Sequence, residues 1–87
     1  MAILLVTYDL MKPGQDYSDL LKSIKSYPWA KLSESSYAID TAKTPKQIYD
    51  ELRSSIDQND HLFVITLSRP YYGYGPKDVV AWLDGRL

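Results

Sequence analysis

The stretch Ala2-Ile-Leu-Leu-Val-Thr-Tyr-Asp-Leu10 decides how this chain folds. It is rich in Ile, Leu and Val and contains no turn residue, which is typical of a strand buried on both faces. We therefore predict that it lies inside a β-sheet rather than at an edge. Tyr8 and Asp9 come at its carboxyl end, where core meets solvent. That position suits a metal ligand or a general base, and it equally suits a solvated strand end.

An amphipathic helix is predicted directly after this strand. Residues 11–15 have the composition of a turn, because Pro13 presets its own backbone angle and Gly14 accepts a positive one. Asp16 is placed to cap the helix, and Pro28 ends it. Apolar residues then follow the helical spacing i, i+3, i+4, i+7 and i+10, at Tyr17, Leu20, Leu21, Ile24 and Tyr27.

Three further strands are predicted. Residues 29–33 and 36–41 alternate in part between apolar and polar side chains, and Glu34-Ser35 connects them as a hairpin. Residues 60–67 form a last strand that is as apolar as the first.

A second helix is predicted between the hairpin and the last strand. Thr44 is its cap, Pro45 takes the first helical position, and Gln47 reaches back from the third. The helix is expected to end near Gln58-Asn59, where Asn takes the left-handed conformation. The side chains expected to face the core are Ile48, Tyr49, Leu52 and Ile56.

The order β-α-β-β-α-β predicts an α+β fold, a ferredoxin-like sandwich. Two right-handed split β-α-β units of this order close into one antiparallel sheet with strand order 4-1-3-2 and both helices on one face. We expect a single domain over residues 1–87, with 68–87 as an appendage: a loop rich in Tyr, Gly and Pro, then a short helix that Gly85 stops. Val79 and Trp82 on this helix are predicted to be buried, either against the sheet of the same chain or across a dimer.

Composition excludes several kinds of chemistry. The chain has 87 residues and no Cys, which rules out disulfides, thiol catalysis and thiolate metal sites. Ten Lys and Arg against eleven Asp and Glu give a net charge of −1, so no overall positive field attracts nucleic acid or an anionic membrane. The first strand is too short to cross a bilayer, and we expect a soluble, cytoplasmic protein. A core of this size is only marginally sufficient, which favours a homodimer.

The predicted topology gathers polar side chains at one edge of the sheet. The residues expected there are Asp9, Ser33, Glu34, Ser35, Ser36, Asp60 and His61. Asp9, with Asp60 and His61, is a candidate ligand set for Mg²⁺ or Mn²⁺, because these ions take oxygen ligands and keep several waters. The alternative is that these strand ends are polar because they meet water.

Arg69, Tyr71, Tyr72 and Tyr74 form a second candidate binding set, on a loop that contains glycine. Tyr rings beside an Arg stack bases and pair with phosphate in proteins that bind single-stranded nucleic acid. The alternative is a packing loop that holds the last helix on the sheet, since Tyr also supplies rigid contact area at protein interfaces. Gly73-Tyr-Gly75 opens a helix but lacks the spacing of a phosphate-binding loop.

Three features together resemble a known superfamily: Tyr8-Asp9 at the end of the first strand, the β-α-β-β-α-β order, and a last apolar strand entered through Asn59-Asp60. Over residues 1 to about 67 the chain resembles the small CRISPR-associated adaptation subunit, the VapD-like toxins and the SinR-like proteins, most of all the SinR-like branch. The resemblance implies a ferredoxin-like homodimer, and several members are metal-dependent ribonucleases or deoxyribonucleases. It also implies that Asp9 meets its twin near the dimer axis and holds a divalent ion.

Two functions follow. The favoured one is a non-catalytic homodimeric binding module that contacts nucleic acid or a protein partner through its open sheet face and the loop Tyr71–Tyr74. The near-neutral charge and the excess of tyrosine, eight against one Phe, favour it. The alternative is a nuclease that depends on Mg²⁺ or Mn²⁺, in which paired Asp9 carboxylates hold an ion that activates water. Tyr8 and Ser36 complete the candidate catalytic set of that alternative.

Overall fold

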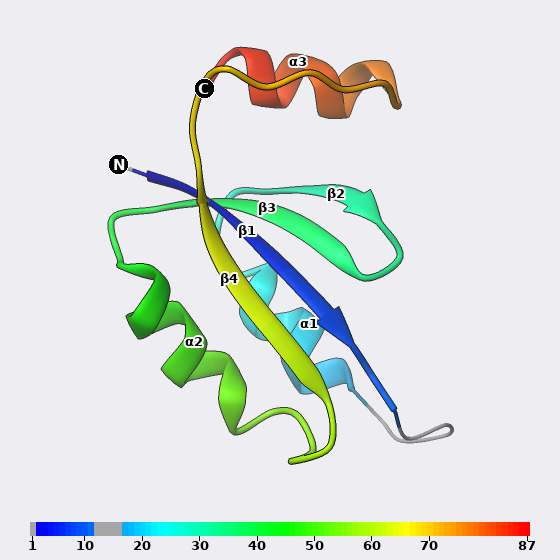
Figure 1. Cartoon of the computed structure of the whole chain (residues 1–87), viewed down its shortest axis with the longest axis vertical. Helices are drawn as coiled ribbons and strands as arrows, with labels where there is room; N and C mark the ends of the chain where they lie inside the picture. Colours follow the sequence, from blue (N-terminus) through cyan, green and yellow to red (C-terminus); the bar gives the residue numbers. More distant parts are fainter. Residues whose placement is uncertain (1, 12–16) are drawn as a thin grey trace.

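The computed structural model describes residues 2–11 and 17–87 (Figure 1). The predicted order of elements is confirmed, and a third helix follows the last strand, as expected for the appendage. The elements are β1 (Ala2–Asp9), α1 (Ser18–Ile24), β2 (Trp29–Ser33), β3 (Ser36–Thr41), α2 (Pro45–Arg53), β4 (His61–Leu67) and α3 (Lys77–Asp84). In the part of the chain that is described, no helix has the length and apolar character needed to cross a membrane.

β1 lies inside a four-stranded sheet with the order β2-β3-β1-β4. Every neighbouring pair of strands is antiparallel, and near the middle of the sheet Val6 stands between Tyr37 on β3 and Val64 on β4. The predicted strand order and the interior place of the first strand are therefore confirmed. An interior strand pairs its backbone groups on both sides, which is why an apolar run without turn residues suits this position.

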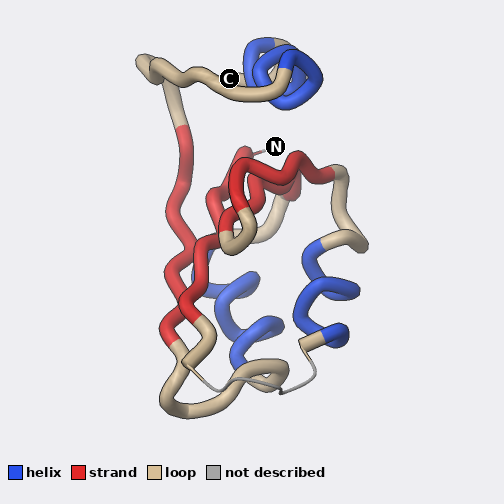
Figure 2. The backbone as a smooth tube through the Cα atoms, turned by 90° about the vertical axis from the view of Figure 1, so that its right-hand side faces the viewer, coloured by secondary structure: helices blue, strands red, loops and turns tan. Residues whose placement is uncertain are grey.

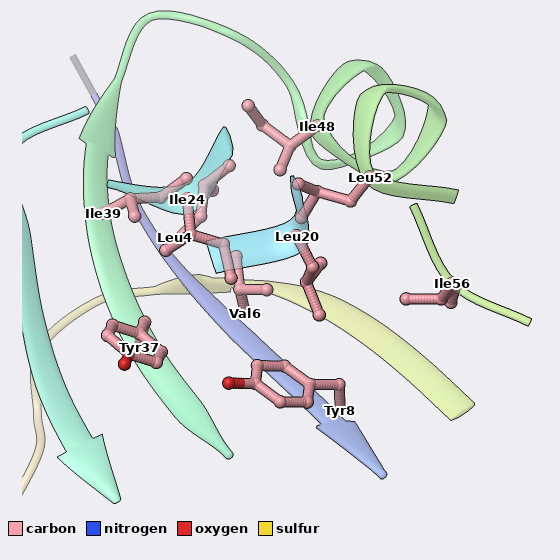
Figure 3. Close-up of a cluster of buried hydrophobic side chains, with 10 residues drawn as sticks. All are labelled: Leu4, Val6, Tyr8, Leu20, Ile24, Tyr37, Ile39, Ile48, Leu52 and Ile56. Carbon is pink, nitrogen blue, oxygen red and sulfur yellow. The ribbon is translucent and has the colours of Figure 1, made fainter. Parts of the chain in front are cut away.

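α1 and α2 cover one face of the sheet, and the main core lies between the helices and that face (Figures 2 and 3). Side chains alternate between the two faces of a strand, so every second residue of β1 points toward the helices. The buried members of this core are Leu4, Val6, Tyr8, Leu20, Ile24, Tyr37, Ile39, Ile48, Leu52 and Ile56.

α2 begins as predicted, with a complete capping box. Thr44 Oγ1 accepts a hydrogen bond from the Gln47 backbone N–H at 3.2 Å, and Gln47 Oε1 accepts one from the Thr44 N–H at 2.9 Å. Pro45 stands at the first helical position, where its missing N–H costs no hydrogen bond. α1 forms in the predicted region, while its expected cap Asp16 and the turn over residues 12–15 lie outside the described residues.

The predicted end of α2 is wrong. The helix stops at Arg53 rather than near Asn59, and among the described residues none other than Gly has a positive φ, so Asn59 is not left-handed. Shorter-range hydrogen bonds compete with the helix here: the Ser55 N–H donates to the Leu52 carbonyl at 2.9 Å. These turns redirect the chain toward the start of β4.

One side chain of α2 is also placed differently from the prediction. Ile48, Leu52 and Ile56 are buried as expected, whereas Tyr49 is 36 % exposed. Adjacent residues of a helix point about 100° apart, so Tyr49 cannot share the core-facing line that Ile48 and Leu52 form.

α3 lies across the end of the sheet, away from α1 and α2 (Figures 1 and 2). Leu83 is buried against Ile3 and Ala38 on the face that α1 and α2 leave free, with Val79 and Trp82 partly buried beside it. Of the two packings that the sequence left open, the structure shows the one within the chain. Gly85 follows α3 as its C-cap, at the position predicted to stop the helix.

A cation secures the end of this appendage to the sheet. The Arg86 guanidinium lies 4.2 Å from the centre of the Trp82 ring, and its Nε donates to Asp40 Oδ2 at 3.1 Å. Asp40 belongs to β3, so this contact joins the last residues of the chain directly to the sheet.

Candidate functional site

The two residues that end β1 point to opposite faces of the sheet. Tyr8 is buried in the helix-side core (Figure 3). Its hydroxyl donates a hydrogen bond to the Glu34 carbonyl oxygen at 3.3 Å. Burial, together with the nearby Tyr37 and Glu34, raises the pKa of the Tyr8 phenol. Asp9 is exposed and alternates to the other face. The structure therefore does not bring the Tyr8 and Asp9 side chains together.

Asp9 lies beside His61 on the open face. The two residues are register partners in the β1–β4 ladder, and the shallow pocket that they share also includes Thr7 and Phe63 in its lining. Ser36 Oγ lies 2.9 Å from Thr7 Oγ1, so this serine adjoins the same pocket. Among residues 2–11 and 17–87, no three His, Cys, Asp or Glu side chains gather closely enough to hold a metal ion. The arrangement presents one carboxylate, one imidazole and a pair of hydroxyl groups.

Asp60 faces a different set of groups. Its Oδ1 accepts the Met11 N–H at 2.7 Å, and its Oδ2 accepts the Tyr17 hydroxyl at 3.0 Å and the Asp57 N–H at 2.8 Å. Burial by itself would raise the pKa of Asp60, but these hydrogen bonds and the nearby Arg53 charge outweigh it and lower that pKa. Both carboxylate oxygens are engaged in joining the end of β1 to the start of α1 and to the turn before β4.

The hairpin residues expected at this edge make local contacts. The Ser35 carbonyl accepts the Tyr8 backbone N–H at 3.0 Å, and the exposed Glu34 carboxylate lies 3.6 Å from Lys31 Nζ. Ser33 is the register partner of Ser36 at the closed end of the hairpin. The structure thus places Asp9 beside His61, keeps Ser36 on the neighbouring strand in contact with Thr7, and directs the remaining polar groups elsewhere.

The second candidate set divides into two pairs, and the first pair anchors the loop to α3. Arg69 donates from Nη2 to the Asp84 carbonyl at 3.1 Å and from Nε to the Leu87 carbonyl. The Tyr71 hydroxyl donates to the Asp84 carboxylate, and this hydrogen bond raises the pKa of Tyr71. The Arg69 guanidinium also lies 5.8 Å from the centre of the Tyr71 ring. Arg69 and Tyr71 therefore hold the last helix in place.

The second pair, Tyr72 and Tyr74, is fully exposed, at 105 % each. The two tyrosines border an apolar groove of about 280 Å³ between the loop, α3 and β2. The other residues that line the groove are Leu32, Tyr71, Gly73, Gly75, Pro76, Val79, Val80 and Leu83. The groove offers aromatic and aliphatic contact, with few charged groups at its wall.

An exposed apolar patch on β4 was not foreseen from the sequence. Phe63 is 61 % exposed and Ile65 is 49 % exposed, both on the sheet face opposite α1 and α2. The apolar run was interpreted as a strand like the first, yet the predicted strand order already placed it at an edge. Residues 62–65 are all apolar, so no alternation of polar and apolar side chains marked the partly solvated face in the sequence.

Comparison of the sequence with protein-family models gives no match, and comparison with curated proteins gives none either.

Proposed function

We propose that the chain is a non-catalytic binding module of the ferredoxin-like type, related to the small CRISPR-associated adaptation subunit, that acts as a homodimer and contacts a protein partner. The observation that carries the proposal is the pair of fully exposed rings, Tyr72 and Tyr74, beside the apolar groove under α3. Tyr combines a large rigid apolar surface with a polar hydroxyl, and it is enriched in protein interfaces.

A protein partner is favoured over nucleic acid by the charges around the loop. Binding to single-stranded nucleic acid needs cations that follow the backbone beside the stacking rings. Arg69 is engaged with the carbonyls of Asp84 and Leu87, and the chain as a whole carries a net charge of −1. Leu32, Val80 and Leu83 in the groove wall offer apolar contact to a peptide side chain.

The β2-β3-β1-β4 order with two helices on one face supports the ferredoxin-like assignment, because two split β-α-β units produce this arrangement. The homodimer is supported by the bare apolar side chains of β4 and by the small size of the core.

The nuclease alternative has one specific observation in its favour, the exposed Asp9 and His61 side by side. Two such carboxylates from paired copies would be needed to share a divalent ion that activates water. Titration calorimetry with Mn²⁺ on wild type and Asp9→Ala tests this. Binding of about one ion per two chains that is lost in the variant would support a shared metal site. No binding to the folded wild type would contradict the nuclease alternative.

The binding proposal is tested with a peptide library. Displayed peptides are selected on wild type alone, and a selected peptide is then titrated by NMR into wild type and into the double variant Tyr72→Ala/Tyr74→Ala. We expect shifts at Leu32, Val80 and Leu83, affinity at least tenfold weaker in the double variant, and no change in Tyr49→Ala. Tyr49 is the matched control because it is a partly exposed tyrosine on another element.

A mixed-sequence single-stranded oligonucleotide is the second probe. If the oligonucleotide binds through Tyr72 and Tyr74 and its affinity falls steeply with salt, the ligand of this surface is nucleic acid rather than a protein. Peptides that bind wild type and double variant equally would contradict the proposed site.

A further inference from the structure

β4 is the outer strand of the sheet, and its outward side carries unpaired backbone groups. The Tyr8 N–H donates toward β3, so the even-numbered residues of β1 pair with β3 and the odd-numbered ones pair with β4. Thr7 faces Phe63 and Leu5 faces Ile65, which places the N–H and C=O groups of 63 and 65 inward. The corresponding groups of Leu62, Val64 and Thr66 therefore point away from β1, and no described strand pairs with them.

This edge lacks the features that normally prevent strand pairing. β4 has seven residues, includes neither Lys nor Pro, and keeps an unbroken register with β1. Proteins usually protect such an edge with charge, proline, a bulge or a covering segment, because unpaired backbone groups accept another strand.

We propose that two copies of this chain pair edge to edge through antiparallel β4 strands, with the twofold axis at Val64. This register pairs every residue of the strand. Val64 then exchanges N–H···O bonds with Val64 of the partner subunit, and Leu62 pairs with Thr66 of the partner subunit, which satisfies the outward groups. On the open face Phe63 stands opposite Ile65 of the partner subunit, where aromatic and β-branched side chains pack well. The two sheets become one continuous eight-stranded sheet.

The edge alone buries too little surface for a tight dimer, since a standard interface takes about 800 Å² from each partner. Phe63 and Ile65, which are 61 % and 49 % exposed, add apolar area on the open face. We therefore expect self-association in the micromolar range.

This dimer rests on the homodimeric part of the proposed function and also separates it from the nuclease alternative. Asp9 is the register partner of His61, which lies three residues along β4 from the twofold axis at Val64. Asp9 itself is on β1, one strand further from that axis. With strands about 4.8 Å apart and about 3.3 Å per residue, the two Asp9 positions stand about 25 Å apart. Asp9 carboxylates at that separation cannot share one metal ion.

The test uses the full chain, with Thr66→Pro as the edge variant and Thr66→Val as its control. Thr66 is exposed and its N–H points outward, so proline removes no bond to β1. Sedimentation across a concentration series should show a monomer–dimer equilibrium in wild type and Thr66→Val, and at least tenfold weaker association in Thr66→Pro.

Amide exchange of the wild type is the second measurement and does not depend on a variant that folds. In the dimer the amides of Leu62, Val64 and Thr66 gain protection as concentration rises, while those of Phe63 and Ile65 are already protected by β1. A wild type that stays monomeric, or a dimer whose outward amides remain unprotected, would overturn the proposal. If the wild type is monomeric and still binds the peptide, edge pairing is wrong and the proposed groove remains supported.

Discussion

The two faces of the sheet are covered to very different extents. On the face under α1 and α2, Leu4, Val6 and Leu52 are at most 1 % exposed. On the opposite face α3 covers only the end that includes Ile3 and Ala38, and Phe63 and Ile65 stay bare. Burial of apolar side chains on the first face therefore contributes most of the hydrophobic stabilisation of the fold. The second face leaves apolar surface available for contact with other molecules.

Matched Leu→Ala substitutions test this comparison most strongly. Leu52→Ala should lower the free energy of unfolding by about 2–5 kcal/mol, because it removes a fully buried side chain and leaves a cavity. Leu83→Ala should cost about 2 kcal/mol, at the low end of that range, since the cluster under α3 is small and can relax around the change. Urea unfolding followed by circular dichroism measures both. An equal or larger loss at Leu83 would contradict the difference between the faces.

The acid stability of the helix-covered layer depends on Asp60, which joins the loops at its end. Its pKa is lowered in the folded chain, so the ionised carboxylate stabilises the fold above its ordinary pKa, near 3.9. That contribution is lost as the pH falls through the lower folded value. Wild type should therefore be more stable than Asp60→Asn at pH 7, and thermal melts should show the difference shrinking below about pH 4. If the stability difference between wild type and Asp60→Asn stays constant down to pH 3, it comes from packing rather than from the charge of the carboxylate.

The smallest effect is expected on the bare part of the open face. Ile65→Thr should change the free energy of unfolding by no more than about 0.5 kcal/mol, because the side chain is already half exposed and Thr is equally suited to a strand. Urea unfolding at a concentration where the chain is monomeric checks this. A loss above about 1 kcal/mol would mean that Ile65 contributes to the folded monomer as the helix-side core does.

Much of the fold could be predicted from local patterns. The apolar run of β1 indicated an interior strand, and Thr44, Pro45 and Gln47 indicated the start of α2, because capping depends on residues within one turn. The end of α2 could not be predicted in the same way. It depends on turn hydrogen bonds such as that from Ser55 to Leu52, and Asn59 is only one of several residues able to end a helix.

The candidate site was only partly predictable. The sequence order placed Asp9 and His61 at the same edge, and their register pairing follows from that topology. Tyr8 was grouped with Asp9 because they are adjacent, although strand alternation separates their side chains. The division of the tyrosine loop into anchoring Tyr71 and exposed Tyr72 and Tyr74 had no sequence signal, since all three occur in one short segment.

Local spacing and the handedness of β-α-β connections were therefore sufficient to predict the type and order of the elements, the strand order and the placement of α1 and α2 on one face of the sheet. Tertiary packing alone settled that α3 covers its own sheet, that Arg69 is engaged, and that Phe63, Ile65, Tyr72 and Tyr74 are left exposed. The reason is physical: exposure is set by whichever segment covers a side chain, and those segments lie far away along the sequence.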